Sequence, residues 1–271
     1  MLKDITIGQF YPTNSLVHKL DPRLKLVALI VYIVFIFMAT SAASLTYMVA
    51  LTFVIILLTK IPLATYLKNI KSILPIILLT ALLNMLYVAE GETIISFWIV
   101  KITDGGISRA IFMAVRIIVL IMSSAMLTYT TTPTMLTDAI ESLLSPLKLI
   151  GLGGAVHTIA MMMTIALRFI PTLIDETDKL MNAQTARGAA FDSGSILKRV
   201  KALIPILIPL LISSIRRAFD LSEAMESRCY TGNHTRTRMK QLKLFARDYI
   251  SLVALVVSFS VTLILNNITF I

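Results

Sequence analysis

Two arginines occupy matching positions in a weak internal repeat of this chain. Arg187 lies near the end of the helical stretch that finishes Ala183–Gly188, and Arg228 lies near the end of the stretch that finishes Ala224–Cys229. In both, an alanine precedes the arginine by one helical turn, and the arginine has small neighbours: Ala186 and Gly188, or Ser227 and Cys229. A guanidinium is planar, permanently charged and able to bind a carboxylate through two hydrogen bonds. At a helix end it can also simply stabilise the dipole and the last carbonyls.

The sequence carries no recognisable catalytic motif. It has no Gly-x-x-x-x-Gly-Lys-Ser/Thr, so we do not expect it to hydrolyse ATP, and it has neither His-Glu-x-x-His nor Gly-x-Ser-x-Gly. The histidines His18, His157 and His234 are isolated, with no second ligand at metal spacing. We therefore expect no enzyme activity, no metal site and no cofactor.

Composition places the chain in a membrane. Its 271 residues are 57% hydrophobic and only 15% charged, with a mean hydropathy of +0.85. A soluble domain carries about 25% charged residues. This excludes an ordinary soluble enzyme, and so much apolar side chain also excludes a disordered chain.

Four uncharged runs predict five membrane helices. Residues 26–59 have no charged side chain and a cluster of small, polar residues near Ser41, which suggests two spans joined by a tight turn. The other uncharged runs are 72–89, 117–137 and 249–271. Residues 1–130 would then hold four transmembrane helices and residues 249–271 a fifth.

Basic residues indicate the orientation. Lys and Arg gather in residues 1–25, 60–71 and 131–248, while the turn near Ser41 has none. The positive-inside rule places the N-terminus in the cytoplasm and, after five spans, the C-terminus outside. The net charge of +10 is then mostly a topology signal. We expect no nucleic-acid binding, because no soluble basic face with stacking aromatics is apparent.

Residues 131–248 are predicted to form a cytoplasmic or interfacial region of amphipathic helices. Thr132-Pro133 is typical of a helix start, and that helix should end near Gly151. The apolar runs 155–170 and 202–215 are short, and if both crossed the membrane, the basic residues of 172–201 would lie outside. We expect Pro171 and Pro209 to open the two helices that end at the arginines, with Arg216 and Asp220 paired at i,i+4.

Arg116 is the one charge expected inside a span. An ionisable group there is functional by default, but Arg109, seven residues earlier, suggests a shared face on which both side chains reach outward. Both interpretations stay open at this point.

The order of these motifs resembles the T component of energy-coupling factor transporters over essentially the whole chain. The similar segments are Ile7–Pro12 with Ser15, Leu20–Leu26, Ala166–Pro171, Ala183–Gly188 and Pro205–Tyr230, the last including Arg217–Asp220 and Ser227–Tyr230. Cys229 departs from the pattern, since the second motif of that family usually ends in glycine.

The resemblance implies a transport scaffold. In that family the T component joins two cytosolic ABC-type ATPases to a small membrane protein, the S component, which captures a vitamin or a metal ion. Two coupling helices lie on the ATPase dimer and insert their arginines into its grooves. Arg187 and Arg228 match those arginines, with Ala186, Gly188, Ser227 and Cys229 beside them.

We therefore expect an all-α, multi-pass cell-membrane protein that acts as the coupling subunit of an importer. The main alternative is a stand-alone secondary transporter, which would need inverted repeats and midplane charges that are not evident. An interaction scaffold unrelated to transport would differ only in its partners. Fourteen methionines, three of them at Met161–Met163, could form an adaptable face that serves several S components, or simply fill the core.

Overall fold

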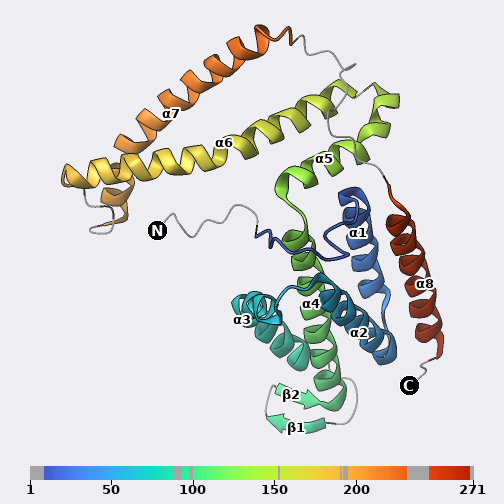
Figure 1. Ribbon diagram of the computed structural model, residues 1–271. Helices are drawn as coiled ribbons and strands as arrows, with labels where there is room; N and C mark the ends of the chain where they lie inside the picture. Colours follow the sequence, from blue (N-terminus) through green and yellow to red (C-terminus); the bar gives the residue numbers. More distant parts are fainter. Residues whose placement is uncertain are drawn as a thin grey trace. The chain divides into compact units, whose positions relative to one another are not determined.

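The computed structural model is almost entirely helical. It describes residues 9–87, 93–97, 100–151, 153–189, 191, 195–230 and 244–268. The helices are α1 (Pro22–Met38), α2 (Ala42–Thr59), α3 (Leu63–Tyr87), α4 (Asp104–Thr130), α5 (Pro133–Leu143), the 3₁₀ helix η2 (Ser145–Ile150), α6 (Gly153–Ala186), α7 (Ile196–Glu226) and α8 (Ala246–Ile268) (Figure 1). Strands β1 (Thr93–Phe97) and β2 (Val100–Thr103) form an antiparallel hairpin that we had not predicted. The all-α membrane class is confirmed.

The chain divides into two compact units. One contains Gly8–Ala139 with Leu242–Ile271, and we call it the bundle; the other contains Ile140–Gln241 with Met1–Ile7, and we call it the platform. The bundle holds α1 to α4 and α8, and the platform holds α6 and α7.

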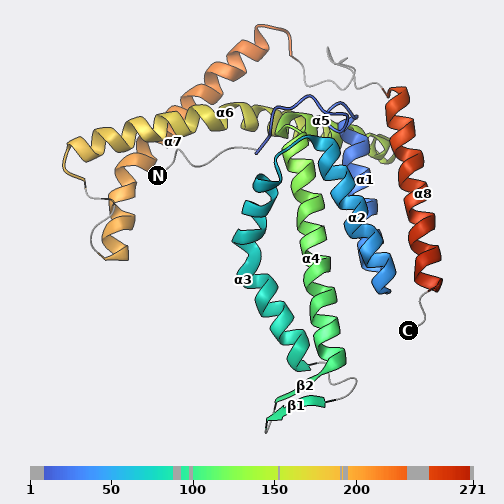
Figure 2. The ribbon, with the colours of Figure 1, turned by 60° about the horizontal axis from the view of Figure 1, so that its bottom comes forward.

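The bundle is built from the predicted spans. Helices α1, α2, α4 and α8 run side by side, and α3 packs against α4 (Figure 2). Tyr32, Phe35 and Met48 lie at the centre, where the ring of Phe35 stacks on Phe259 of α8 with 4.4 Å between centroids. The Tyr32 hydroxyl donates to the carbonyl of Met48, so the buried phenol is satisfied inside the apolar core.

Hydrogen bonds hold the N-terminal segment against the helix ends of the bundle. The Tyr11 N–H donates to the Tyr129 carbonyl over 3.0 Å, and His18 Nε2 donates to the Tyr11 carbonyl over 2.9 Å. Burial lowers the pKa of His18, because desolvation disfavours the imidazolium. The ammonium of Lys25 donates to the carbonyls of His18 and Thr130.

Asp248 is the most deeply buried acid of this region, at 1% exposure. One oxygen accepts the Asp21 N–H over 2.9 Å, and the other accepts the Phe245 N–H at the start of α8 over 2.7 Å. Asp21 in turn caps α1 by accepting the Arg23 N–H. The Asp248 carboxylate therefore connects the start of α8 to the residue that caps α1.

Arg116 is held within the bundle. Its guanidinium donates to the carbonyl of Ala39, which ends α1, and its Cζ lies 4.8 Å from the ring centroid of Phe112. Asn266 of α8 accepts from the Thr40 and Ser41 amides in the same α1–α2 turn. These contacts favour a role for Arg116 in packing this turn.

The number of helices that could cross a membrane differs from the expected five. Six described helices are long and apolar enough by length and composition: α2, α3, α4, α6, α7 from Val200, and α8 to Asn267. The count omits α1, which has only 17 residues, and adds α6 and α7. Our placement of α6 and α7 in the cytoplasm or at the interface stays a prediction.

The two added helices, α6 and α7, are long because they continue through the prolines of the platform. We expected Pro171 and Pro209 to open helices, but Pro171 lies inside α6, and Pro205 and Pro209 lie inside α7. A proline removes one backbone hydrogen bond and favours a kink, yet the long helix continues on both sides. The apolar runs 155–170 and 202–215 are thus parts of helices of 34 and 31 residues.

The end of α5 also differs from expectation. The helix begins at Pro133 as predicted, but it ends at Leu143 rather than near Gly151. Pro146 disfavours the α conformation of the residue before it, and residues 145–150 form the 3₁₀ helix η2 instead. Gly151 follows with φ of +82°, a conformation that favours glycine.

Candidate coupling site

Helix α6 ends in a Schellman motif centred on Arg187. The Ala189 N–H donates to the Gln184 carbonyl over 3.0 Å, and the Gly188 N–H donates to the Thr185 carbonyl over 2.9 Å. Gly188 has φ of +88°, the left-handed conformation that this motif needs after the capping residue. Ala186 is the last residue of the α-helix, and Arg187 is its C-cap.

Helix α7 ends in the same motif, centred on Arg228. The Tyr230 N–H donates to the Met225 carbonyl over 3.0 Å, and the Cys229 N–H donates to the Glu226 carbonyl over 2.9 Å. Relative to these hydrogen bonds, Arg228 holds the position that Arg187 holds in α6. The weak sequence repeat is therefore a repeat of one local structure.

Cys229 occupies the left-handed position where the first motif has glycine. Its φ is +56°, so the departure from the family pattern leaves the cap geometry unchanged. A side chain in this conformation costs roughly 1 kcal/mol relative to glycine. The thiol is exposed, beside Arg228.

Both arginines are available to a partner. Arg187 and Arg228 are exposed, and neither guanidinium makes a hydrogen bond or ion pair with any residue in the described part of the chain. Each lies just after the last turn of a helix, at the negative end of its dipole. Neither cation is used internally by the residues that the structure describes, and a planar fork in this position suits a carboxylate on another molecule.

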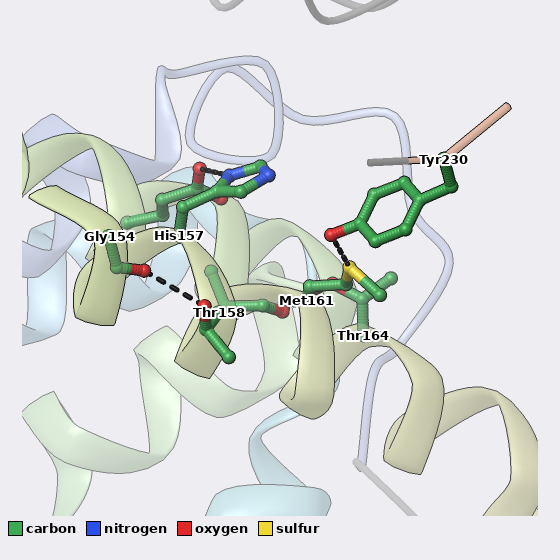
Figure 3. Close-up of polar contacts among 8 residues, drawn as sticks. Gly154, His157, Thr158, Met161, Thr164 and Tyr230 are labelled. Atoms are coloured by element: carbon green, nitrogen blue, oxygen red, sulfur yellow. Dashed lines mark hydrogen bonds and ion pairs between the residues drawn. The ribbon is translucent and has the colours of Figure 1, made fainter. Parts of the chain in front are cut away.

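The two arginines lie at opposite ends of an antiparallel helix pair. Tyr230, two residues after Arg228, donates its hydroxyl to the sulfur of Met161 over 2.9 Å, close to the start of α6 (Figure 3). Arg187 directly follows Ala186, the last residue of the same helix. From Met161 to Ala186 the helix rises about 38 Å, at 1.5 Å per residue. The two arginines are therefore well separated along the helix pair.

A groove lies along the last turns of α7. It has a volume of about 330 Å³ and is lined by Ala218, Leu221, Ser222, Met225, Glu226 and Tyr230. Tyr230 thus caps the helix through its N–H, lines the groove with its ring and contacts α6 through its hydroxyl. Only the position of Tyr230 directly after the motif could have pointed to this role from the sequence alone.

A second polar contact fixes the start of α6. His157, which the sequence left isolated, places Nδ1 3.3 Å from the Glu141 carboxylate (Figure 3). Glu141 belongs to α5, so this pair connects the beginning of α6 to the preceding helix.

An ion pair between Arg217 and Glu176 joins α7 to α6 in the second half of each helix. We expected Arg216 to pair with Asp220 along one helix, but the structure uses the neighbouring arginine across two helices. Both partners are partly exposed, at 30% and 23%. The pair therefore fixes the register of the antiparallel helices more than it adds to their stability.

Breaking this ion pair should cost little stability and still impair coupling between the helices. We expect Arg217→Ala and Glu176→Ala each to destabilise the protein by about 1 kcal/mol or less. The exchanged variant Arg217→Glu/Glu176→Arg should recover part of the loss, as measured by thermal unfolding in detergent and by uptake in cells. Additive losses in the exchanged variant would show that the two side chains are not coupled.

Comparisons with known proteins agree over nearly the full chain. The family model CbiQ, described as a cobalt transport protein, matches residues 13–239. A protein of Ruminiclostridium cellulolyticum named energy-coupling factor transporter transmembrane protein EcfT is 48% identical over 270 residues, covering all of both chains. Proteins of the same name from Clostridium kluyveri and Bacillus subtilis are 48% and 41% identical, with 94% and 95% of this chain covered, and 95% and 96% of theirs.

Proposed function

Because the chain belongs to the CbiQ family and is the transmembrane component of an energy-coupling factor transporter, we propose that it is the coupling subunit of an ATP-driven importer. Two cytosolic ABC-type ATPase subunits would bind the platform, and a small S component would bind the substrate, a vitamin or a metal ion. ATP hydrolysis would then belong to the partners, and this chain would transmit their movement.

The matched caps of α6 and α7 support this proposal most strongly. Two identical, unpaired arginines at opposite ends of one helix pair suit a partner that presents two equivalent grooves. A dimer of ATPase subunits has that symmetry, since each half offers the same surface. We infer that Arg187 enters one groove and Arg228 the other, with acidic side chains as their partners.

The ion pair and the tyrosine contact explain how movement would pass between the two arginines. Arg217–Glu176 and Tyr230–Met161 connect α7 to α6 at two levels of the platform. When the ATPase halves close, a displacement of either arginine would move both helices together, because the two contacts resist sliding.

The apolar side chains of the platform support binding of an S component. On α7, exposed residues recur at helical spacing: Leu203, Ile204, Leu207, Ile208, Leu211, Ile212, Ile215 and Phe219. On α6, Ile159, Met162 and Met163 are exposed as well. A surface of this kind needs a membrane or a protein to cover it. The flexible methionines would allow more than one S component to be accepted.

Purification of the tagged chain from its native membrane in mild detergent tests the proposal. We expect two ATPase subunits and at least one small membrane protein to copurify, and the number of distinct small proteins distinguishes a shared module from a dedicated one. A chain that purifies alone and moves a solute in proteoliposomes without ATP would instead be a secondary transporter.

The orientation is tested in whole cells and in membrane vesicles, before any detergent is added. We propose that the N-terminus and the platform are cytoplasmic and that the C-terminus lies outside, since the basic residues concentrate in residues 1–25, 60–71 and 131–248. Labelling of Cys229 in intact cells by a membrane-impermeant thiol reagent should fail, and labelling of opened membrane vesicles should succeed.

A further inference from the structure

Three lysines lie where α2 ends and α3 begins, and we call them the lysine surface: Lys60, Lys68 and Lys71. All three are exposed, and none forms an ion pair or a side-chain hydrogen bond with a residue that the structure describes. Residues 22–89 contain no aspartate or glutamate, so no acid from these helices neutralises them. The coupling role proposed above leaves these lysines unused.

The backbone places the three lysines at one corner of the fold. Lys60 directly follows α2 in the left-handed conformation, with φ of 57°, and turns the chain toward α3, which starts at Leu63. Lys68 and Lys71 are one helical turn apart on α3, about 4.5 Å along its axis. All three therefore lie within the corner between the helices and the first turns of α3.

An exposed apolar stripe adjoins the lysine surface. Leu67 and Leu74 are 60% and 44% exposed, and they precede and follow Lys71 by four and three residues, on the same side of α3. Leu78, one turn further, is 60% exposed. Because α3 is long and apolar enough to cross a membrane, this stripe continues from the lysines toward the bilayer core.

We propose that the lysine surface binds the headgroup of an anionic phospholipid, with an acyl chain along Leu67, Leu74 and Leu78. The ammonium groups suit a phosphate diester, and the leucines beside them suit hydrocarbon. An acidic protein would match the charge alone, whereas a phospholipid matches both the charge and the apolar stripe. The bound lipid holds the α2–α3 corner at the membrane surface.

Native mass spectrometry of the purified full-length chain tests this site with phosphatidylglycerol and phosphatidylcholine as probes. In Lys60→Gln/Lys68→Gln/Lys71→Gln we expect phosphatidylglycerol to bind at least tenfold more weakly and phosphatidylcholine to bind unchanged. A basic residue at an anionic membrane surface contributes roughly fivefold to affinity, so the loss of three exceeds tenfold even if one engages poorly.

Two control variants separate a site from general charge. Lys19→Gln/Lys179→Gln/Lys201→Gln removes three exposed lysines elsewhere, and its affinity for phosphatidylglycerol should stay within twofold of the original. Lys60→Arg/Lys68→Arg/Lys71→Arg keeps the charge and should retain binding. Equal losses in the two glutamine variants would overturn the proposal.

Competition with inorganic phosphate distinguishes a lipid site from a simple anion site. We expect a large excess of phosphate to displace little phosphatidylglycerol, because phosphate cannot replace the acyl contacts with the leucines. Full displacement would overturn the lipid assignment. The test uses the chain without its partners, so its result is independent of whether the ATPases bind Arg187 and Arg228.

Discussion

Arg187→Glu and Arg228→Glu should each reduce substrate uptake at least thirtyfold while leaving the chain folded. Both guanidiniums are exposed and unpaired, so their reversal removes no contact within the described structure. In an ATPase groove lined by carboxylates, a glutamate at either position would instead be repelled by the negative charges of the groove. Losing one partner of a buried, hydrogen-bonded charge pair costs 2–5 kcal/mol, which is about thirtyfold or more.

The measurements are uptake by whole cells and the amount of ATPase that copurifies with each variant. Each single variant should retain weak ATPase binding through the remaining arginine, and the double variant should lose it. This pattern follows from two separate contacts at opposite ends of one helix pair. If one single variant alone abolished all binding, the two arginines would not be equivalent anchors.

Arg216→Glu provides the matched control. Arg216 is exposed on α7 and undergoes the same change of charge, but it lies within the helix and not at its cap. Substrate uptake by cells with the Arg216→Glu variant should stay within about twofold of uptake by cells with the unchanged protein. Equal losses in Arg216→Glu and Arg228→Glu would mean that the net charge of the platform, and not the capping arginine, is what the partner recognises.

The helices of the bundle were predicted well from the sequence, because each long uncharged run indicates a membrane helix by itself, without information from distant residues. Uncharged runs long enough to span a membrane admit few structures other than a helix, and each predicted run is helical over most of its length, in α1 and α2, in α3, in α4 and in α8. The run 117–137 extends beyond the end of α4 at Thr130. The C-terminal ends of α6 and α7 in the platform could also be predicted, because the small residues after Arg187 and Arg228 are typical of helix caps. The identical Schellman geometry confirms that α6 and α7 end where the repeat predicted.

The beginnings of α6 and α7 could not be read in the same way. Proline is typical of a first helical turn, so Pro171 and Pro209 favoured helix starts there. The structure keeps both inside long helices, since a missing hydrogen bond costs less than the loss of a whole apolar helix segment. A proline alone does not distinguish a start from a kink.

Contacts between distant segments were beyond the sequence. Arg216 and Arg217 are adjacent and chemically identical, and only the register of α6 against α7 selects Arg217 for Glu176. Likewise, nothing near Asp248 in the sequence reveals that it accepts the amide of Asp21, 227 residues earlier. Such pairs depend on helix packing, which a single sequence without its relatives does not encode visibly.

Asp248→Ala should destabilise the bundle more than any substitution at its surface. Asp248 is 1% exposed and binds the buried amide of Asp21 as well as the Phe245 amide that opens α8. Its removal leaves a buried N–H without an acceptor, withdraws a negative charge from the neighbourhood of Lys25 and removes the helix cap. We expect a loss of roughly 2–5 kcal/mol, seen as a clear fall in the unfolding midpoint in detergent.

Two further variants separate the causes of that loss. Asp248→Asn keeps an oxygen acceptor for the Asp21 amide but removes the charge, so it should lose less than Asp248→Ala. Asp104→Ala removes an acid from the first turn of α4, where the side chain is exposed, and should cost only about 0.5 kcal/mol. If Asp248→Ala matched Asp104→Ala, the carboxylate would act only on the helix dipole. If Asp248→Ala loses more stability than Asp104→Ala, and Asp248→Asn loses less than Asp248→Ala, then the hydrogen bond from Asp248 to the Asp21 amide connects α1 to α8. The position of the N-terminal segment depends on that connection.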